Sequence, residues 1–522
     1  MLGNRQSLNA DQTWDLLVVG GGITGAGILR EAAQAGLAVL LVEQRDFASG
    51  TSSRSSKLVH GGLRYLNNFQ FGLTWQSVHA RDALLAVGEG LIEPLPFVYP
   101  IYHKDKMPAW LVEFGLYMYG WMGGQWRVHQ RVGRDEVALA SPDLSDSDLT
   151  GAFRFYDAQT DDARLVLRVL REGMEAGGQA VNYARVQRLL RDADGTVSGA
   201  VIDDQVSGAQ VEIKARAVVN ATGVWADGLR NGDARLRPLR GSHLIFRQDR
   251  FPLYQAVSFP HPDDGRPVFA FPWEGVTLLG TTDLDHEADL DEEPAISPEE
   301  LDYLLRAVQG HFPLLNLTID DVLVTFAGVR PVLDTEAADN PSEASREHAI
   351  WLEDGLLTVT GGKLTTFRSM AHEALDRLRA QVRDFAVNKN KAGLNRLPPL
   401  EHIPAGLSRW EAQRLQARYG PAIVDFVCQM PLDDRRRVDG LPIHWLEFTW
   451  AARHEAVVTL SDLLLRRVRI GLLSANGGEK YLPRIRQLVQ AELGWDDARW
   501  LEEETAYLEQ WHAKHSVPVQ AR

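Results

Sequence analysis

Short apolar runs interrupted by glycine-rich turns characterise the first part of the chain. Residues 14–44 read WDLLVVGGGITGAGILREAAQAGLAVLLVEQ, in which the runs LLVV and LAVLLVE flank a glycine turn and the segment ILREAAQAG. Uninterrupted apolar runs of this length are typical of buried parallel strands, and Gly36 stands where a helix would end. The pattern therefore predicts a strand, a turn, a helix and a second strand that ends at Glu43.

The same combination of an apolar run and glycines returns twice. The segment ARAVVNATGVWADGL places a predicted strand before Ala221, Thr222 and Gly223. The segment GLLTVTGGKLTTFRSMAHEALDRL places another before Gly361 and Gly362, with a predicted helix after them. Distant parts of the chain are thus expected to return to one α/β unit.

The intervening and C-terminal segments follow other patterns. Residues 71–150 and 236–325 are rich in proline, aromatic residues and alternating stretches such as HLIF, which predict a mixed or antiparallel sheet with helices. From about residue 395 the period becomes helical, as in RWEAQRLQARYG, and predicts a third, all-helical domain.

The composition limits the classes of function. A chain of 522 residues, 45% hydrophobic and 24% charged, is expected to form two or more globular domains. The formal net charge of -15 excludes bulk nucleic-acid binding, although a local pocket can still be basic. Cys428 is the only cysteine, so no disulfide can form within the chain, and a reducing compartment fits this usage. No apolar run is long enough to predict a membrane-spanning helix.

Gly20, Gly22 and Gly25 form a G-x-G-x-x-G turn between the first predicted strand and helix. Such a turn lets the backbone approach a pyrophosphate, whose charge then lies at the helix N-terminus. Glu43 follows 23 residues after Gly20, where a carboxylate accepts hydrogen bonds from both ribose hydroxyls and repels a 2′-phosphate. The arrangement predicts a dinucleotide site and disfavours NADP.

The interruption of the nucleotide fold favours FAD over NAD. Nicotinamide-binding folds usually continue with alternating strands and helices, whereas this chain leaves the fold after Glu43 and returns near residues 210 and 355. A helix beginning after Gly361 and Gly362 would point its positive end at the flavin and stabilise the negative charge of the reduced ring. A glycine-initiated helix without a ligand is the alternative for this segment.

Several segments together resemble one family. In chain order they are DLLVVGGGITGAG, TSSRSSKLVHGGLRYL, DDARLVL, VVNATGVWAD, RGSHLIF, LLGTTD, FAGVRPV and GGKLTTFRSMAHEALDRL. They resemble the FAD-dependent glycerol-3-phosphate dehydrogenases, the quinone-linked, membrane-associated enzymes also called aerobic glycerol-3-phosphate dehydrogenases. The resemblance covers residues 14 to about 385, and the helical C-terminal region resembles the cap domain of that family more loosely.

The resemblance implies a fold class. It implies an α/β chain with an FAD-binding Rossmann-like domain of the glutathione-reductase/D-amino-acid-oxidase type, a mixed-sheet substrate domain and a C-terminal all-helical cap domain. The expected boundaries are 1–70, 151–235 and 326–390 for the discontinuous FAD-binding domain, 71–150 and 236–325 for the substrate domain, and 395–522 for the cap domain.

The resemblance also implies a reaction. sn-Glycerol 3-phosphate would lose a hydride from C2 to N5 of FAD, giving dihydroxyacetone phosphate, and the electrons would pass to a quinone of the respiratory chain. The implied partners are the substrate, a quinone, the membrane surface and a second copy of the chain in a homodimer, with no nucleic acid. The expected location is the cytoplasm, at the inner face of the cell membrane.

One loop is expected to serve both cofactor and substrate. By resemblance, Arg64 and Tyr65 bind the substrate phosphate, for which the planar fork of an arginine is suited. A basic surface turn paired with acidic residues is the alternative. The other expected phosphate contacts are Thr281 and Arg346. The expected cofactor contacts are Gly20, Gly22, Gly25, Glu43, Thr51, Ser52, Ser56, Lys57, Ala221, Thr222, Gly223, Gly361, Gly362 and Thr365. No metal site is expected.

Three residues are expected near the reacting carbon. His243 is the expected general base for the C2 hydroxyl, since an imidazole titrates near neutral pH; a lone histidine before an apolar strand is otherwise more often structural. Arg330 stays protonated and is expected to bind the C2 oxygen and stabilise developing negative charge. Lys363 is expected to act likewise or to support a flavin carbonyl. A buried salt bridge for Arg330 and a surface position for Lys363 are the alternatives.

Residues 108–126, PAWLVEFGLYMYGWMGGQW, are apolar and crowded with aromatic residues. Such side chains favour the boundary between membrane and water, where Lys104, Lys106 and Arg127 would meet anionic headgroups. The segment suggests a contact with one membrane leaflet, and a buried helix is the alternative. A second basic stretch contains Arg466, Arg467 and Arg469. Its simplest interpretation is a solvated helix face, and a headgroup contact or a domain interface is the alternative.

Other functions use related sequences. A glycerol-3-phosphate oxidase of the same fold would give its electrons to O2; no long extra segment precedes the helical region, which favours the dehydrogenase. An amine-oxidising flavoenzyme shares the FAD turn but does not need the phosphate cations Arg64 and Arg346. A non-catalytic FAD-binding regulator would not need His243, Arg330 and Lys363.

Overall fold

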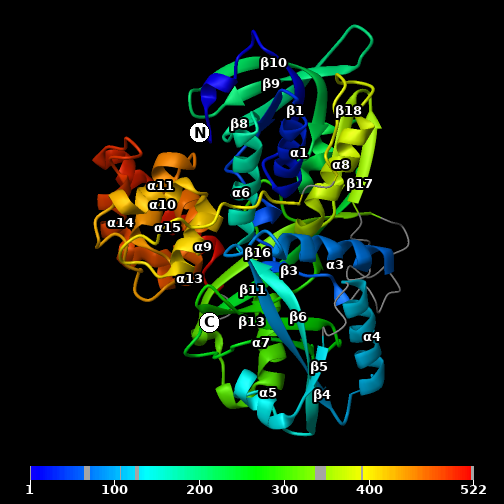
Figure 1. The fold of residues 1–522 in the computed structure, drawn as a ribbon, viewed down its shortest axis with the longest axis vertical. Coiled ribbons are helices and arrows are strands. Elements are labelled where there is room, and N and C mark those ends of the chain that lie inside the picture. Colours follow the sequence, from blue (N-terminus) through cyan, green and yellow to red (C-terminus); the bar gives the residue numbers. More distant parts are fainter. Residues whose placement is uncertain are drawn as a thin grey trace.

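Two β-sheets and a helical unit make up the molecule (Figure 1). The computed structural model describes residues 2–63, 71–105, 107–123, 129–334, 348–389 and 392–518. The two sheets follow each other along the longest axis, and the C-terminal helices lie beside them. The predicted α/β class with a separate helical C-terminal region is therefore confirmed.

The first sheet contains the predicted nucleotide-binding strands. Its main order is β17-β18-β10-β1-β2-β7, with parallel pairing from β18 to β7, and the antiparallel strands β9 and β8 extend from β10. The glycine turn connects β1 to α1, as the apolar pattern predicted. The bounds are Thr13–Val19 (β1), Val39–Val42 (β2), Gln179–Val181 (β7), Ala184–Arg191 (β8), Val197–Asp204 (β9), Ala209–Asn220 (β10), His348–Glu353 (β17) and Leu356–Gly361 (β18).

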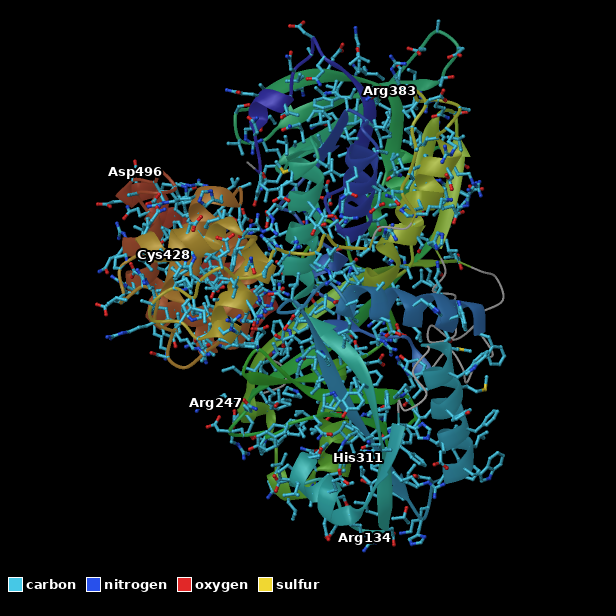
Figure 2. All side chains as sticks on the ribbon, in the orientation of Figure 1. Arg134, Arg247, His311, Arg383, Cys428 and Asp496 are labelled. Carbon is cyan, nitrogen blue, oxygen red and sulfur yellow. The ribbon has the colours of Figure 1, made fainter. Side chains whose placement is uncertain are left out.

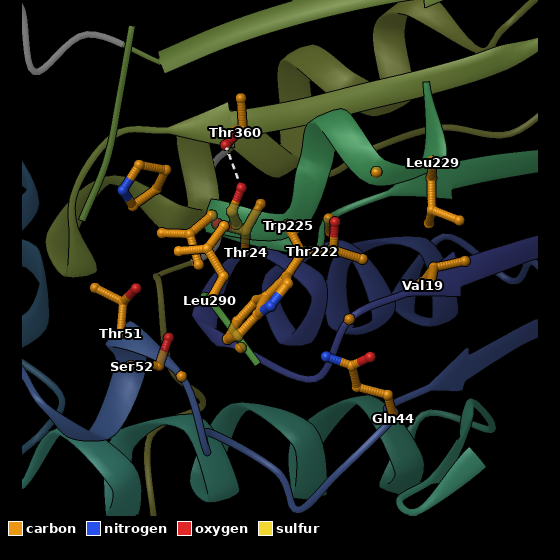
Figure 3. Close-up of a pocket in the computed structure, with 18 of the residues that line it drawn as sticks. Val19, Thr24, Gln44, Thr51, Ser52, Thr222, Trp225, Leu229, Leu290 and Thr360 are labelled. Atoms are coloured by element: carbon orange, nitrogen blue, oxygen red, sulfur yellow. Dashed lines mark hydrogen bonds between the residues drawn. The ribbon is translucent and has the colours of Figure 1, made fainter. Parts of the chain in front are cut away.

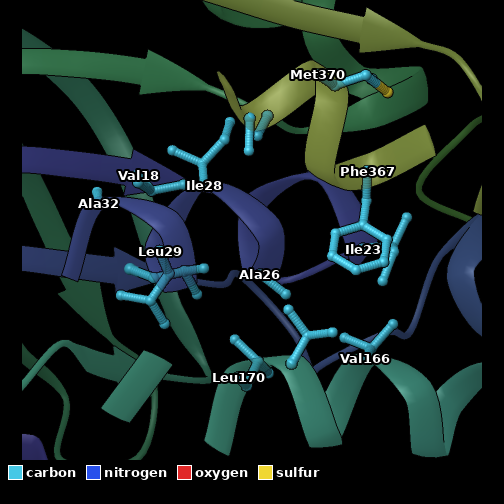
Figure 4. Close-up of a cluster of buried hydrophobic side chains, with 14 of the residues drawn as sticks. Val18, Ile23, Ala26, Ile28, Leu29, Ala32, Val166, Leu170, Phe367 and Met370 are labelled. Carbon is cyan, nitrogen blue, oxygen red and sulfur yellow. The ribbon is translucent and has the colours of Figure 1, made fainter. Parts of the chain in front are cut away.

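Helix α1 is buried against the first sheet and between helices α6 and α8. Figure 4 shows Leu29 of α1 beside Leu170 of α6, with Phe367 of α8 closing the other side. Gly27 permits this approach, because a Cβ there would lie 2.8 Å from a ring carbon of Phe367. Segments far apart in the chain thus share one core. The helix bounds are Ile23–Gln34 (α1), Asp162–Glu175 (α6) and Phe367–Arg377 (α8).

The second sheet is mixed, as its alternating patterns predicted. Its main order is β15-β11-β14-β13-β12-β4-β6-β3, with β16 paired to β11 and β5 paired to β6; β12 and β4 run parallel and the other pairs are antiparallel. The strand bounds are Leu58–Val59 (β3), Ile92–Tyr102 (β4), His129–Val132 (β5), Leu149–Thr160 (β6), Leu236–Arg247 (β11), Ala256–Pro260 (β12), Pro267–Trp273 (β13), Val276–Gly280 (β14), Leu284–Asp285 (β15) and Val322–Leu333 (β16). The helices of this part are Phe71–Leu85 (α3), Ala109–Met122 (α4), Arg134–Ala140 (α5) and Pro298–His311 (α7).

Two long strands carry the chain from one sheet to the other. The expected boundary at residue 151 falls inside β6, and the one at residue 326 falls inside β16, and both strands belong to the second sheet. The first sheet and helices α1, α6 and α8 are called the first unit here. The chain enters this unit only after these strands end; α6, for example, follows β6 directly. Backbone pairing within the second sheet runs along both strands past these residues, with one register shift in each ladder. The expected domain boundaries stay a prediction.

The C-terminal helical unit is joined to the rest by buried ion pairs. Asp46, which is fully buried, accepts hydrogen bonds from Arg466 and from both terminal nitrogens of Arg467, at 2.7 and 2.6 Å. The interpretation of this basic stretch as a solvated face is therefore wrong, because its arginines form a domain interface. Cys428 lies exposed in this unit (Figure 2). The main helices are Arg409–Tyr419 (α9), Ala422–Gln429 (α10), Trp445–His454 (α11), Leu460–Asp462 (α12), Ile470–Leu473 (α13), Leu482–Val489 (α14) and Asp497–Lys514 (α15).

Asp46→Ala is expected to lower the free energy of unfolding by about 3–5 kcal/mol, because it leaves the buried guanidinium of Arg467 without its carboxylate and that of Arg466 with Asp462 alone. Urea denaturation followed by circular dichroism measures the change. Asp433→Ala is the matched control, since Asp433 pairs with Arg436 where both side chains are 77% exposed, and it should change stability little. Equal losses in the two variants would contradict the interface energetics.

Candidate active site

A cavity of about 680 Å³ lies at the carboxyl ends of the parallel strands of the first sheet. Figure 3 shows its wall, with Thr24 of α1, Ser52 and Trp225 around it. The hydroxyl of Thr360 donates to the carbonyl of Gly223 at 3.0 Å and so ties the end of β18 to the loop after β10. Three separate segments are therefore held around one cavity.

The glycine turn brings the first strand and helix to this cavity at close range. Gly20 has a φ of 111°, and a Cβ at Gly25 would lie 1.9 Å from the carbonyl oxygen of Gly20. Only glycine at both positions allows this approach. The N–H of Ile23, at the start of α1, donates to the hydroxyl of Ser52 at 3.0 Å. The N-terminus of α1 thus faces the cavity, as a site for a pyrophosphate requires.

Glu43 lies on the cavity wall with both carboxylate oxygens held by the backbone. Oε2 accepts the N–H of Gly21 at 2.6 Å, and Oε1 accepts the N–H of Arg45 at 2.9 Å. Burial raises the pKa of Glu43, and the nearby Asp46 adds to this effect. The carboxyl group is therefore positioned in advance at the place where the sequence predicts a ribose contact.

Most of the predicted cofactor residues line this cavity. Those on its wall are Gly20, Gly22, Glu43, Thr51, Ser52, Ala221, Thr222, Gly223, Gly361 and Gly362. Gly25 lies behind the wall inside α1. The other three predicted residues, Ser56, Lys57 and Thr365, are not among its lining residues in the described part of the chain.

Trp225 is a wall residue that the sequence did not single out. Its indole Nε1 is buried and has no hydrogen-bond partner among the described residues. The hydroxyl of Thr365, three residues past Gly362, is also buried without a hydrogen-bond partner among the described residues. A glycine cradle, a helix N-terminus, a positioned carboxylate and a buried donor without a partner fit FAD. The only sequence signal for Trp225 was its place two residues after the A-T-G turn.

His243 lies on β11 between β14 and β16, buried and held on two sides. Its Nε2 lies 2.9 Å from the hydroxyl oxygen of Ser56. Its ring stacks on Phe326 of β16, with centroids 4.5 Å apart and planes 6° apart. On β14, a Cβ at Gly280 would lie 2.2 Å from the imidazole, so glycine is required there. Nδ1 has no hydrogen-bond partner among the described residues.

The imidazole of His243 is neutral at physiological pH. Burial lowers its pKa well below 6.5, and the positive charges of Arg330 and Lys57 lower it further. A neutral imidazole can accept a proton, as a general base must.

Arg330 lies on the same strand as Phe326 and is held by two side chains. Its guanidinium donates to Asp283 at 3.1 Å and to the hydroxyl of Thr281 at 3.3 Å. A Cβ at Gly241 would lie 2.6 Å from this guanidinium, so the neighbouring strand leaves it room. Arg330, predicted near the reacting carbon, and Thr281, predicted at the phosphate, are thus brought together. Asp283, a buried carboxylate, is the partner that the sequence analysis missed.

A pair of glycines lets the loop after β2 lie against this sheet. Gly241 and Gly328 face each other on β11 and β16. A Cβ at Gly328 would lie 2.4 Å from the carbonyl oxygen of Arg54. The hydroxyl of Thr51 donates to the carbonyl of Val329 in the same region. The loop that lines the cavity therefore also reaches His243.

Two predicted residues occupy positions that the sequence did not suggest. The side chain of Ser56 faces His243. The ammonium of Lys57 is fully buried and binds Asp162 at 3.0 Å. Lys363 lines the cavity and donates to the hydroxyl of Ser77 at 2.8 Å. The remaining predicted substrate contacts lie outside the described residues; they are Arg64, Tyr65 and Arg346.

Comparison with protein families gives two matches. The family described as FAD dependent oxidoreductase matches residues 15–387, and the one described as C-terminal domain of alpha-glycerophosphate oxidase matches residues 357–500. The chain is 35% identical over 517 residues to the aerobic glycerol-3-phosphate dehydrogenase of Bacillus subtilis, covering 93% of this chain and 92% of that protein. It is 33% identical over 492 residues to the protein of the same name from Staphylococcus aureus, covering 89% of this chain and 88% of that protein.

Two solved structures have similar folds. The glycerol-3-phosphate dehydrogenase from Bacillus halodurans, complexed with FAD, covers 99% of this chain and 98% of its own with a TM-score of 0.76 and 27% identity. The L-alpha-glycerophosphate oxidase from Mycoplasma pneumoniae, with FAD bound, covers 74% of this chain and 99% of its own with a TM-score of 0.59 and 20% identity. The second likeness extends to the fold alone.

Trp225→Phe is expected to weaken FAD binding by up to roughly tenfold, because it removes one buried hydrogen-bond donor and part of the ring surface on the cavity wall. Titration of the FAD-free protein with FAD, followed by flavin fluorescence, measures the affinity. Trp14→Phe is the matched control, since Trp14 is also buried with an unpartnered Nε1 but lies outside the cavity wall. Identical affinities in the two variants would remove Trp225 from the FAD contacts.

Proposed function

Because the chain belongs to the FAD-dependent oxidoreductases, and within them to the family of FAD-dependent glycerol-3-phosphate dehydrogenases, we propose that it oxidises sn-glycerol 3-phosphate to dihydroxyacetone phosphate and passes the electrons to a quinone. FAD is its cofactor. The relatives named aerobic glycerol-3-phosphate dehydrogenase support the substrate. A neutral, buried imidazole beside a fixed guanidinium, His243 beside Arg330, is the observation that carries the proposal.

The proposed chemistry divides among the residues of the second sheet. FAD, when bound, supplies the hydride acceptor. His243 takes the proton of the C2 hydroxyl at Nδ1, which has no hydrogen-bond partner among the described residues, while Nε2–H donates to the hydroxyl of Ser56 and fixes the ring. Arg330 binds the C2 oxygen and stabilises developing negative charge, while Thr281, the predicted phosphate contact, accepts a hydrogen bond from Arg330. Lys363 supports either the C2 oxygen or the flavin from the cavity wall.

The substrate phosphate needs cations of its own. The predicted residues Arg64, Tyr65 and Arg346 fill this role in the proposal, by their match to the family motif. The nearest described part of that loop is tied down, since the N–H of Gly61 donates to the buried carboxylate of Asp157 at 3.1 Å.

The exposed face of α4 supports a membrane contact, which a quinone acceptor requires. Helix α4 buries Val112, Leu116 and Tyr119 and exposes a row of large apolar side chains. That row consists of Trp110, Leu111, Phe114, Tyr117 and Trp121, which are 41% to 66% exposed. The alternative of a buried helix does not account for this row. Within the described ranges, no helix combines the length and apolar character needed to cross a membrane.

The aromatic row continues onto the neighbouring helix. Trp75 of α3 is 46% exposed and its ring lies 6.1 Å from that of Trp121, edge to face. Glu113, the one acidic residue of α4, is neutralised by Arg131. We therefore place the membrane surface against α3 and α4. The homodimer implied by the resemblance stays a prediction.

Stepwise addition of sn-glycerol 3-phosphate to the purified FAD-loaded protein without oxygen is expected to bleach the oxidised-flavin band, while glycerol is expected to leave it unchanged. A visible spectrum measures the effect, and a soluble quinone added afterwards should restore the band. A flavin that neither compound bleaches would contradict the substrate assignment. Restoration by O2 but not by quinone would instead indicate an oxidase.

His243→Ala is expected to slow flavin reduction by ~10²- to 10⁴-fold with FAD still bound, because the general base is lost. Since the pKa of His243 lies well below 6.5, the wild-type rate should lose this base only as pH falls through that lower value. Anaerobic stopped-flow measurements between acidic and neutral pH give both results. His311→Ala, at the far end of the second sheet (Figure 2), is the control and should reduce normally. A loss of rate centred at pH 6.5 would contradict this prediction, because His243 would then have the pKa of an exposed histidine.

Replacing Trp110 and Trp121 together by Glu is expected to abolish co-sedimentation with vesicles that contain phosphatidylglycerol, because both rings leave the interface and two charges enter it. Leu501→Glu, at a 64% exposed position of α15, is the matched control and should still sediment. Flavin reduction by substrate should remain normal in both variants. Continued sedimentation of a folded Trp110/Trp121 variant would rule out this surface.

A further inference from the structure

The turn that carries Ser56 is fixed by one buried carboxylate. Asp162 is fully buried at the start of α6. Its Oδ2 accepts the N–H of Ser55 at 3.0 Å and the hydroxyl of Ser55 at 2.8 Å. Both oxygens also accept from the ammonium of Lys57, at 3.0 and 3.1 Å. The residues on both sides of Ser56 are thereby held by the same group.

Arg469, from the C-terminal helical unit, closes the turn from outside. Its guanidinium donates to Oδ1 of Asp162 and, at 3.1 Å, to the carbonyl of Ser53. The same carbonyl accepts from Lys57 at 3.1 Å. Arg469 is 2% exposed and is not among the lining residues of the cofactor cavity in the described part of the chain. Its contacts therefore reach the turn and not the cofactor.

The backbone of the helical unit is distorted where it delivers this side chain. Residues Leu463–Arg467 form a π-helical turn, and Arg469 has a φ of 66°. In a regular α-helix Arg467 and Arg469 would point to nearly opposite sides, since two steps of about 100° separate them. Here both are buried against the first unit, as is Arg466. π-Helical turns occur frequently at functional sites.

Arg469 supplies part of the positive charge around two adjacent buried carboxylates, together with Lys57 and with Arg418, which lies 3.8 Å from Asp161. Asp161 and Asp162 lie side by side, and Arg469 contacts both, with its Nε 3.3 Å from Asp161. Burial and the neighbouring Arg469 lower the pKa of Lys57 to about 8, although the two carboxylates oppose this. Loss of Arg469 would leave two buried carboxylates with less positive charge than they need, which favours a shift of the turn.

We propose that Arg469 and Asp162 are positioning residues through which the C-terminal helical unit holds Ser56 on His243 in the orientation needed for catalysis. The kinetic test of this inference rests on the proposed function, whereas the structural role of Arg469 and Asp162 does not. The inference assigns to the helical unit a role in the chemistry, although none of its described residues lines the cofactor cavity.

The test compares Arg469→Lys with Arg467→Lys. Both variants weaken a buried ion pair between the same two units, but only Arg469 contacts the turn. Arg469→Lys should slow flavin reduction at saturating sn-glycerol 3-phosphate by ~10- to 100-fold, with bound FAD and substrate affinity nearly unchanged. Arg467→Lys should lower thermal stability without this loss of rate. Equal rates in the two variants would overturn the proposal.

A double-mutant cycle separates positioning from a general loss of structure. Ser56→Ala should also slow reduction, and adding Arg469→Lys to it should have little further effect, because Arg469 acts through Ser56. Full multiplication of the two effects would overturn the proposal. If Arg469→Lys does not fold, Ser55→Ala removes one hydrogen bond to Asp162 without changing charge, and it should give a smaller slowing of the same kind; an unchanged rate there would overturn the proposal.

A measurement without turnover distinguishes this inference from the proposed function. In protein labelled with ¹⁵N-histidine, the His243 signals are assigned by their loss in His243→Asn. Arg469→Lys should shift the Nε2 signal, because the bond to Ser56 is altered, whereas Arg467→Lys should not. If sn-glycerol 3-phosphate fails to reduce the wild-type flavin, the proposed function fails while this signal still reports on the turn. An Nε2 signal that Arg469→Lys leaves in place would overturn the positioning role.

Discussion

The turn Thr51–Lys57 has to satisfy all three parts of the molecule at once. Its hydroxyl groups bind the start of α1 in the first unit and the carbonyl of Val329 in the second sheet. Its carbonyl at Ser53 accepts from Arg469 of the helical unit. A shift of this turn in any direction would break one of these contacts. The placement of the cofactor cavity next to the buried histidine therefore depends on a single short stretch of backbone.

Buried charge holds the units together. Asp46 binds two arginines, and Asp162 binds Lys57 and Arg469, all of them almost completely buried. Such pairs contribute little net stability against their desolvation cost, yet removal of one partner is strongly destabilising. Their main effect is therefore to fix how the units dock, and their contribution to net stability is small. Although burial by itself raises the pKa of Asp46, the two guanidinium groups keep it below its ordinary value.

The same electrostatics prepare the chemistry. Burial, assisted by the positive charges of Arg330 and Lys57, lowers the pKa of His243 and keeps the imidazole neutral, and Asp283 holds Arg330 ready for a developing negative charge. A neutral base beside a fixed cation suits removal of a proton from an alcohol whose oxygen becomes more negative. The site is preorganised, because Gly241 and Gly280 leave room for the side chains of Arg330 and His243. A Cβ at either glycine would collide with them.

The sequence by itself determined whatever depends on neighbours along the chain. The G-x-G-x-x-G turn and Glu43 were predictable because one strand, one helix and the next strand position them. The order of the motifs along the chain was sufficient to indicate the family. It did not determine that Ser56 faces His243, that Lys57 is buried on Asp162, or that Arg466, Arg467 and Arg469 face inward. Those positions depend on strands and helices hundreds of residues apart. A lysine or arginine next to glycines has the same local pattern whether it meets a ligand, water or a buried carboxylate. Only the tertiary structure supplies the partner, because the cost of burying a charge is offset by a group from elsewhere in the chain.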